Sequence, residues 1–536
     1  MAASEVCAGA MMIAGIRRLR AWGEKGDGGR MREWWQQSVH GPNHKWWALV
    51  TVALGTFMAT LDSSIVNISL PSILSYFRSD LATIQWVVLA YLLTITSLLL
   101  TFGRLADIWG RKKVYTIGFG IFTIGSLACG LSPTPTYLIA ARIAQAVGAA
   151  MLQANGLAIT NAVFPNKERG RALGINGTVV ATGTTLGPTI GGLLVGAFGW
   201  QSIFFVNIPV GIIGIGMAVA ILEERRISTR REGAAARFDP LGAILISIAL
   251  VTLLLGLNRG DEVGWLSAQI LGLFAVAIVC FAAFIYVERR VVAPILDLAL
   301  FKVRAFATGS LAALCSFLAI SANAFLMPFF LQLVLGFSPA RAGLLLTPTS
   351  LTLAVVAPLS GYLSDRFGAR ILSSLGLMIS AVALFLLSRL TAGAHYTDVL
   401  FRLILLGIGT GIFNSPNTSA VFSSVPRDRY GVAGGFLSMV RNSGQVIGVA
   451  IAGALLVAAI APLVGEAGLD ALRTGANGGT TAGPLLNAFM NGFQHAFLLS
   501  AIIAACGAVV SLSRGSRPVV GGAAPVATVA VEAEGK

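Results

Sequence analysis

The chain has little charge and few residues suited to metal or redox chemistry. Only 11% of its 536 residues are charged, whereas 56% are hydrophobic, which is unlike the composition of soluble domains. The cysteines are Cys7, Cys129, Cys280, Cys315 and Cys506, and the histidines are His40, His44, His395 and His495. No two cysteines form a C-x-x-C pair and the histidines are scattered, so the sequence indicates neither disulfide nor metal chemistry and disfavours a metal-dependent enzyme.

The N-terminal segment also lacks a convincing signal peptide. Its apolar stretch, residues 8–16, is short, and a basic cluster around Arg17 and Arg20 follows that stretch instead of preceding it. We interpret residues 1–45 as a basic cytoplasmic tail. Whether Met1 or Met31 is the first residue is left open by the sequence.

Long apolar runs are what the chain does have. Most are near the roughly 20 residues that a helix needs to cross a bilayer, which predicts an all-α polytopic membrane protein. We expect fourteen spans, at residues 46–71, 82–102, 114–131, 136–160, 172–197, 201–222, 240–257, 268–287, 305–332, 342–363, 371–388, 399–425, 431–460 and 494–513. The segment 461–493 is then the longest loop, with room for a surface helix.

The basic residues predict the orientation of these spans. If the N-terminus is inside, thirty of the 38 Lys and Arg fall on cytoplasmic segments, five on external ones and three within spans. Translocation of Lys and Arg is opposed during insertion, so both termini are expected in the cytoplasm of the cell, with the chain multi-pass in its plasma (inner) membrane. The net charge of +15 is then mostly a consequence of topology. We find no basic face or aromatic platform for nucleic acid.

An internal repeat divides the chain into two halves. GRLADIWGRKKV at 103–114 returns in degraded form as GYLSDRFGAR at 361–370, a displacement of 258 residues. A charged loop repeated once per half is typical of transporters built from two similar bundles. We predict a six-helix half at 46–222, a linker with two inserted helices at 223–304, a second six-helix half at 305–513 and a cytoplasmic tail at 514–536.

Asp62, in LDSSIVNISLP, is the one carboxylate that we place inside a span. A charge there is costly and is a functional hypothesis by default. Arg142 of the fourth span is expected at similar depth, in the outer half of the membrane, and is the natural partner. Two interpretations stay open, a proton-coupling pair that is made and broken or a static pair that orders the bundle.

Two further motifs suggest conformational roles. In the repeated loops, Gly103 is expected to allow close helix contact and Gly110 a tight turn. Asp107 can pair with Arg111 four residues on, or face a helix N-terminus of the other half; the second copy offers Asp365 and Arg366. We expect these groups both to lock the cytoplasmic side and to anchor the topology; the alternative is that Arg111, Lys112 and Lys113 serve only as anchors. The fifth span reads GTTLGPTIGG, in which Gly183, Gly187, Pro188, Gly191 and Gly192 combine a smooth stripe for helix contact with a site for a bend. Polar residues within the spans are candidates to line a cavity: Asn67, Gln145, Gln153, Asn323, Arg402 and Asn414.

Together these motifs resemble the major facilitator superfamily and, within it, the fourteen-span drug:proton antiporter family. The resemblance covers about residues 46–513 and also rests on QWVVLAYLL, RIAQAVGAA, FFVNIPVG and LQLVLGFSPARAG. It implies roles for Asp62, Arg142, Asp107, Arg111, Gly187 and Pro188. The chain departs from the family pattern in having Ile108 where a basic residue is usual, Ala146 where Gly is expected, and Gln201-Ser202 in place of a basic–aromatic pair.

The resemblance implies a multidrug efflux protein, a proton antiporter that exports hydrophobic or lipophilic-cation compounds by alternating access and confers drug resistance. Its partners would be the small-molecule substrate, protons and membrane lipid, with no cofactor beyond the proton gradient; a periplasmic adaptor is left open. Because the tenth span, 342–363, has no acid, we expect monocations, zwitterions or neutral amphiphiles as substrates rather than dications. The alternatives are a dedicated exporter of one endogenous metabolite, lipid or antibiotic, a symport importer, and a membrane enzyme, for which no catalytic cluster is visible.

Overall fold

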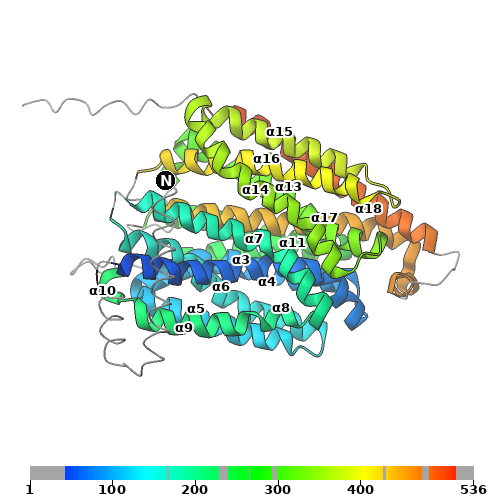
Figure 1. Ribbon diagram of the computed structural model, residues 1–536, viewed down its shortest axis with the longest axis horizontal. Coiled ribbons are helices and arrows are strands. Elements are labelled where there is room, and N and C mark those ends of the chain that lie inside the picture. The colour runs from blue at the N-terminus through cyan, green and yellow to red at the C-terminus, as the bar shows by residue number, and fades with distance from the viewer. Residues whose placement is uncertain are drawn as a thin grey trace, which may run out of the picture.

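The computed structural model describes residues 41, 43–165, 168–227, 240–264, 266–291, 298–426, 430–473 and 482–514, and the regular elements in these residues are all helices. Most of the two predicted tails, 1–45 and 514–536, lies outside these residues. Figure 1 shows the helices running roughly parallel, with the earlier part of the chain below the later part.

The first group of helices, called here the N-terminal group, contains α3 to α9. Its members are α3 (His44–Phe77), α4 (Leu81–Trp109), α5 (Arg111–Gly130), α6 (Pro135–Val163), α7 (Arg169–Phe198), the short α8 (Ser202–Phe205) and α9 (Asn207–Ile221). A one-turn helix, α10 (Glu224–Ile227), follows and lies against α5 and α6.

The second group, called the C-terminal group, contains α13 to α18. After a 3₁₀ turn (Leu298–Lys302) its members are α13 (Arg304–Phe329) with a terminal π-turn η2 (Phe330–Val334), α14 (Pro339–Phe367), α15 (Ala369–Ser388), α16 (Tyr396–Ser423), α17 (Tyr430–Arg473) and α18 (Ala482–Leu512). The two groups meet where α17 packs on α4 and α14 packs on α7.

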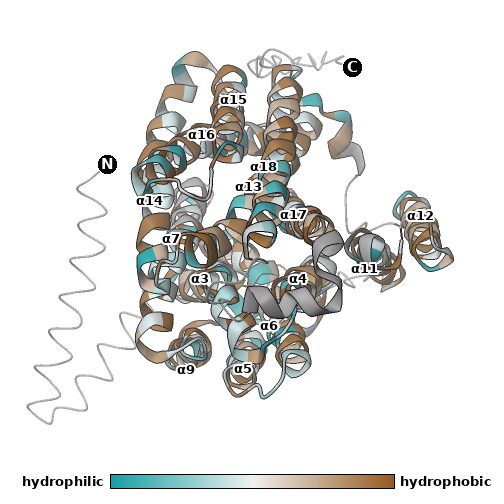
Figure 2. Cartoon of the chain, turned by 90° about the vertical axis from the view of Figure 1, so that its right-hand side faces the viewer, coloured by the Kyte–Doolittle hydropathy of each residue, from teal (hydrophilic) through white to brown (hydrophobic). Residues whose placement is uncertain are grey.

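Two helices stand outside both groups. These are α11 (Pro240–Val263) and α12 (Ala268–Glu288), and Figure 2 shows them together at one edge of the molecule. The inner of the pair, α11, packs against α4 and α17, and Ser247 Oγ donates to the Ser97 carbonyl at 2.7 Å. The outer one, α12, packs against α11 and leaves apolar side chains such as Ile278 and Val279 exposed, as expected of a helix that faces lipid.

The helices account for the predicted number of spans. Within the described residues, thirteen helices are long and apolar enough to cross a membrane, and a shorter apolar helix at Leu241–Leu257 lies in the place of the predicted seventh span. The all-α class and the approximate count of fourteen are therefore confirmed. Orientation and the exact domain boundaries stay predictions.

Local sequence explains where several helices begin. Asp80 accepts from the Thr83 amide at 2.7 Å to cap α4, and Thr134 and Ser338 cap α6 and α14 in the same way. In the last two cases a proline follows the cap, at a position where its missing N–H costs nothing. All three caps lie at one end of the bundle, which is the end that we predict to be outside and call the outer end.

The helices differ from the predicted spans mainly at the C-terminal side. The expected long loop at 461–493 is largely helical, because α17 continues to Arg473 and α18 already begins at Ala482. The sixth span is also broken, into α8 and α9, at Val206. Hydropathy marks the part of a helix that matches the bilayer, so it does not locate helical ends beyond the apolar core or interruptions within it.

Candidate functional site

Asp62 lies in the middle of α3 and is fully buried. Its Oδ2 accepts from Arg142 Nη1 at 2.5 Å, and its Oδ1 accepts from Gln145 Nε2 and Asn207 Nδ2, both at 2.8 Å. All three contacts come from N–H donors, which is the arrangement that suits an ionised carboxylate. The structure thus brings Asp62 and Arg142 together and adds two amides to the pair.

The Arg142 guanidinium has further partners that do not depend on Asp62. It is 1% exposed, its Nε donates to the Val87 carbonyl at 3.2 Å, and its Nη1 donates to Gln145 Oε1 at 2.7 Å. The guanidinium carbon also lies 3.8 Å from the centre of the Tyr91 ring, a cation–π distance. A protonated Asp62 would therefore leave the arginine with a carbonyl, an amide oxygen and an aromatic face.

Ser126 forms a second layer behind the carboxylate. Its Oγ accepts from Gln145 Nε2 at 2.6 Å and from Asn207 Nδ2 at 3.1 Å. The network joins α3, α5, α6 and α9 within the N-terminal group, and Asn207 enters it from the first position of α9 after the break. We call Asp62, Arg142, Gln145, Asn207 and Ser126 the buried polar network.

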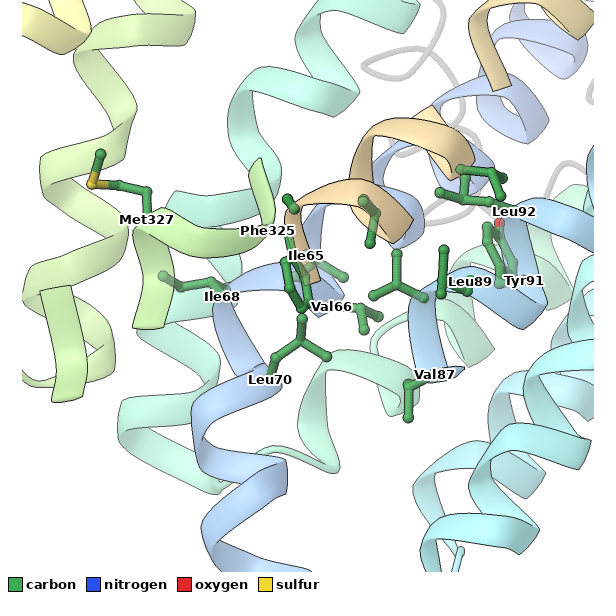
Figure 3. Close-up of a cluster of buried hydrophobic side chains, with 14 of the residues drawn as sticks. Ile65, Val66, Ile68, Leu70, Val87, Leu89, Tyr91, Leu92, Phe325 and Met327 are labelled. Atoms are coloured by element: carbon green, nitrogen blue, oxygen red, sulfur yellow. The ribbon is translucent and has the colours of Figure 1, made fainter. Parts of the chain in front are cut away.

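An apolar layer lies beside this network toward the outer end. Figure 3 shows Ile65, Val66, Ile68 and Leu70 of α3 close to side chains of α4 and to Phe325 and Met327 of α13. All of these residues are buried. Because the layer includes residues of both groups, it stays assembled only while the two groups remain together at this end.

Specific contacts join the two groups toward the outer end. Gln332 Nε2 donates to the Ile68 carbonyl at 2.9 Å, and Gln85 Nε2 donates to the Val449 carbonyl at 2.9 Å. The Thr189 and Thr347 hydroxyls lie 2.5 Å apart, across α7 and α14. These contacts close the outer end in the arrangement seen here.

The glycine–proline motif of α7 faces two neighbours. A side chain at Gly183 or Gly187 would collide with Thr60 or Ser64 of α3, and one at Gly191 would meet Ile65 and Ile68. Gly192 instead lies against the Pro339 carbonyl of α14, in the other group, while the Pro188 carbonyl occupies the space beside Gly343. One face of the motif therefore fixes α7 within its own group, and the other face forms part of the junction between groups.

The loop of the first repeat is held by an acid that lies outside the repeated motif, Glu224. Arg111 Nη2 lies 3.0 Å from Asp107 Oδ1, as the four-residue spacing predicts. Glu224 of α10 accepts from the Arg111 and Lys112 amides, each at 2.9 Å, and so caps α5. Gly110 is required for two reasons. Its φ of +97° favours glycine, and a side chain at this position would collide with the Glu224 carboxylate. Gly103 shows no such tight contact, because an added Cβ would lie 4.0 Å from Ala154.

The remaining predicted residues are spread over both groups. Arg366 is exposed and contacts Tyr362, while the side chain of Asp365 is outside what the structure describes. Buried atoms of Asn67, Asn323 and Arg402 have no hydrogen-bond partner among the described residues. Asn414 is half-buried in α16. Gln153 differs from the others in that its Oε1 accepts from Arg441 of α17, across the two groups, at 3.3 Å.

Two residues around Asp62 lie in motifs that carry the family resemblance, although neither is among the predicted site residues. Asn207 belongs to FFVNIPVG and Tyr91 to QWVVLAYLL. Ser126 had no motif to point to it. Glu224 had only its position at the end of the sixth span as a signal.

Comparison with known proteins agrees with this architecture. The family model described as Major Facilitator Superfamily matches residues 52–449. The chain belongs to the major facilitator superfamily. Membership makes it a multi-pass membrane transporter and not an enzyme.

Several relatives of the chain have names that state a transported compound or a resistance. The chain is 36% identical to riboflavin transporter RibZ of Clostridioides difficile (strain 630) over 402 residues, which cover 75% of this chain and 86% of the relative. It is 38% identical to multidrug resistance protein Stp of Mycobacterium tuberculosis (strain CDC 1551 / Oshkosh), covering 76% and 75%. It is 31% identical to the tetracenomycin C resistance and export protein of Streptomyces glaucescens, covering 87% and 90%. This superfamily member is thus related to drug-resistance and antibiotic-export proteins.

A solved structure supports the fold alone. A bacterial homologue of the human lysosomal transporter spinster, in an inward-facing and unoccupied conformation, superposes with a TM-score of 0.62 at 18% identity, covering 89% of this chain and 99% of that one.

Proposed function

We propose that this transporter is a proton-coupled antiporter that exports hydrophobic small molecules by alternating access, with Asp62 as the proton site. The observation that carries the proposal is a fully buried carboxylate whose three partners are all N–H donors. An ionised Asp62 behind a closed outer end is the state expected after the proton has left toward the cytoplasm. Relatives named for drug resistance and antibiotic export support the direction of transport.

Protonation of Asp62 would act on the junction between the groups through α3. It removes the charge that holds Arg142, so that the link between α3 and α6 is weakened. Six residues further along, the Ile68 carbonyl of the same helix accepts from Gln332 of the C-terminal group. A shift of α3 would therefore alter a hydrogen bond that helps to close the outer end.

The geometry gives a lipophilic cation no direct partner on Asp62. Both carboxylate oxygens are occupied and the side chain has no exposed surface. Asp62 thus serves proton coupling in this proposal, and the substrate is recognised elsewhere.

The test is pH-gradient-driven dye accumulation in everted membrane vesicles, with wild type beside Asp62→Asn. We expect the variant to bind dye and to lose accumulation driven by the pH gradient, because an amide cannot exchange the proton. Asp398→Asn, at an exposed acid in the first turn of α16, is the control and should transport normally. Undiminished active transport by Asp62→Asn would remove Asp62 from the mechanism.

Export of a single endogenous metabolite is the second candidate. It is favoured by relatives whose names specify one compound, riboflavin or tetracenomycin C. A panel of substrates tested on a deletion strain separates the two, since a dedicated exporter changes tolerance to one chemical class only.

A further inference from the structure

Arg441 is a membrane-embedded cation that the proposed proton site does not use. It lies in α17, eight residues after Ala433, where the apolar span Ala433–Ile460 begins. At about 1.5 Å per residue it is roughly 12 Å inside the span, on the side predicted to be cytoplasmic. A charge at this depth needs a partner or a polar surface.

The side chain reaches the surface where the two groups face each other. Arg441 Nη2 donates to Gln153 Oε1 of α6 at 3.3 Å. Two turns earlier on the same face of α17, Gly434 lies against Leu157, which is one turn along α6 from Gln153. Arg441 is half-buried rather than enclosed, so the remaining donors of its guanidinium are not sealed inside either group.

No carboxylate neutralises this arginine among the described residues. The spans of α13, α14, α15, α17 and α18 contain no Asp or Glu, and Asp398 of α16 is exposed at the predicted outer end. The fully buried acid of the other group, Asp62, is already held by Arg142. The neutral Gln153 supplies one hydrogen bond and no charge, so the surface between the groups is locally positive.

From this we infer that Arg441 is a substrate-binding residue and that the preferred substrates are amphiphiles carrying a carboxylate. A guanidinium presents parallel N–H donors that match the two oxygens of a carboxylate. A charged hydrogen bond is also worth more at a desolvated site than in water. The inference rests on the proposed export function, because it names the substrate class that this transporter would carry.

Two dyes that differ at one group provide the test. Rhodamine 110 carries a free carboxylate, whereas rhodamine 123 is its methyl ester, and both keep the same cationic ring system. Binding of each to the purified full-length protein is measured by fluorescence polarisation. We expect wild type to bind the free acid at least ten-fold more tightly than the ester. A wild type that binds both equally, prefers the ester or binds neither overturns the inference, and this comparison requires no variant to fold.

Three variants assign the preference to Arg441. Arg441→Gln should weaken binding of the acid about ten-fold or more and change binding of the ester by less than two-fold. Gln153→Ala removes the hydrogen-bond partner of Arg441 and keeps its charge, so this variant should retain the preference for the free acid. If Gln153→Ala and Arg441→Gln weakened binding of the acid equally, Arg441 would act only by joining α17 to α6. Arg389→Gln, at an exposed position after α15, makes the same change in net charge and should also retain the preference.

Failure of this inference can be told apart from failure of the export proposal. Under a pH gradient, Arg441→Gln should still accumulate the ester in everted vesicles, whereas Asp62→Asn should accumulate neither dye. If wild type binds the acid selectively but accumulates nothing under a pH gradient, the proton-coupled function fails and the carboxylate site stands.

Discussion

Asp62 depends on side chains that are themselves uncharged. Gln145 and Asn207 both donate to its Oδ1, and both also donate to Ser126. The amides hold the carboxylate in one orientation while Arg142 supplies the charge. Loss of either amide would remove one of the two donors to Asp62 Oδ1 and one of the two donors to Ser126 Oγ, and a hydrogen bond to a charged group is worth about 1.5–3 kcal/mol.

Asn207→Ala tests this dependence at the level of one residue. The change removes one donor to Asp62 and one to Ser126 and leaves a small gap at the start of α9. We expect the free energy of unfolding to fall by about 1–3 kcal/mol, measured as a lower thermal midpoint in detergent. Asn43→Ala is the matched control, because Asn43 is exposed and makes no side-chain cap to α3; its midpoint should be unchanged. Equal stability of the two variants would show that Asn207 is not part of a working network.

The charged members of this site could be predicted from sequence, and the neutral ones could not. A charge inside an apolar span is costly enough that it must have a reason, which selects Asp62 and Arg142 at once. Neutral side chains such as Asn207 and Ser126 cost little free energy in a membrane helix and are common there, so the sequence does not single them out before the helix packing is known. Arg441 was visible as a charge in a span, but its lack of an acid and its contact with Gln153 emerge only from the packing.

At the scale of helices, α7 shows how one motif serves two interfaces. Gly183 and Gly187 allow α7 to touch α3, whereas Gly192 allows it to touch α14 across the groups. The sequence predicts a smooth helix face from the four-residue spacing. It does not predict which glycine faces which neighbour, because that depends on the rotation of α7 about its own axis.

Gly192→Ala tests the part of the motif that joins the groups. The added methyl would press on the Pro339 carbonyl of α14, and overpacking of this kind costs about 1–3 kcal/mol. Because the clash exists only while the outer end is closed, we expect the variant to populate an outer-open state more than wild type. Spin labels at positions 131 and 389, both exposed at the predicted outer end, would then report a larger long-distance fraction.

The same helix contains its own control. Gly177 has no atom within 4 Å of an added Cβ, so Gly177→Ala should leave the label distances unchanged and stabilise α7 slightly, since alanine favours helix. If Gly192→Ala gave the same distances as Gly177→Ala, the contact with Pro339 would not hold the outer end closed.

For the whole molecule, the spans followed from hydropathy because the bilayer demands long apolar helices. The longer-range facts did not follow. The Gln332–Ile68 and Gln85–Val449 contacts join residues 264 and 364 positions apart, and no local pattern encodes them. The placement of charge in the two groups is also a property of the whole molecule. The buried ion pair lies in one group, and Arg441, which no acid among the described residues balances, lies in the other.

This placement of charge makes the response to membrane voltage depend on the substrate. Exchange of one proton for a monocation moves no net charge across the membrane, whereas exchange of one proton for a zwitterion moves one charge. The two substrates differ by one transported charge however many protons are exchanged. One charge crossing 100 mV is worth about 2.3 kcal/mol, which sustains a gradient of roughly 50-fold at about 1.4 kcal/mol per decade.

In proteoliposomes with no pH gradient, a potassium diffusion potential should therefore accelerate exchange of rhodamine 110 for protons well beyond that of rhodamine 123. Protein-free liposomes correct for passive entry of the cationic ester. An equal effect of voltage on the two dyes would mean that the carboxylate does not cross the membrane in its charged form, and that the arginine on α17 does not carry it.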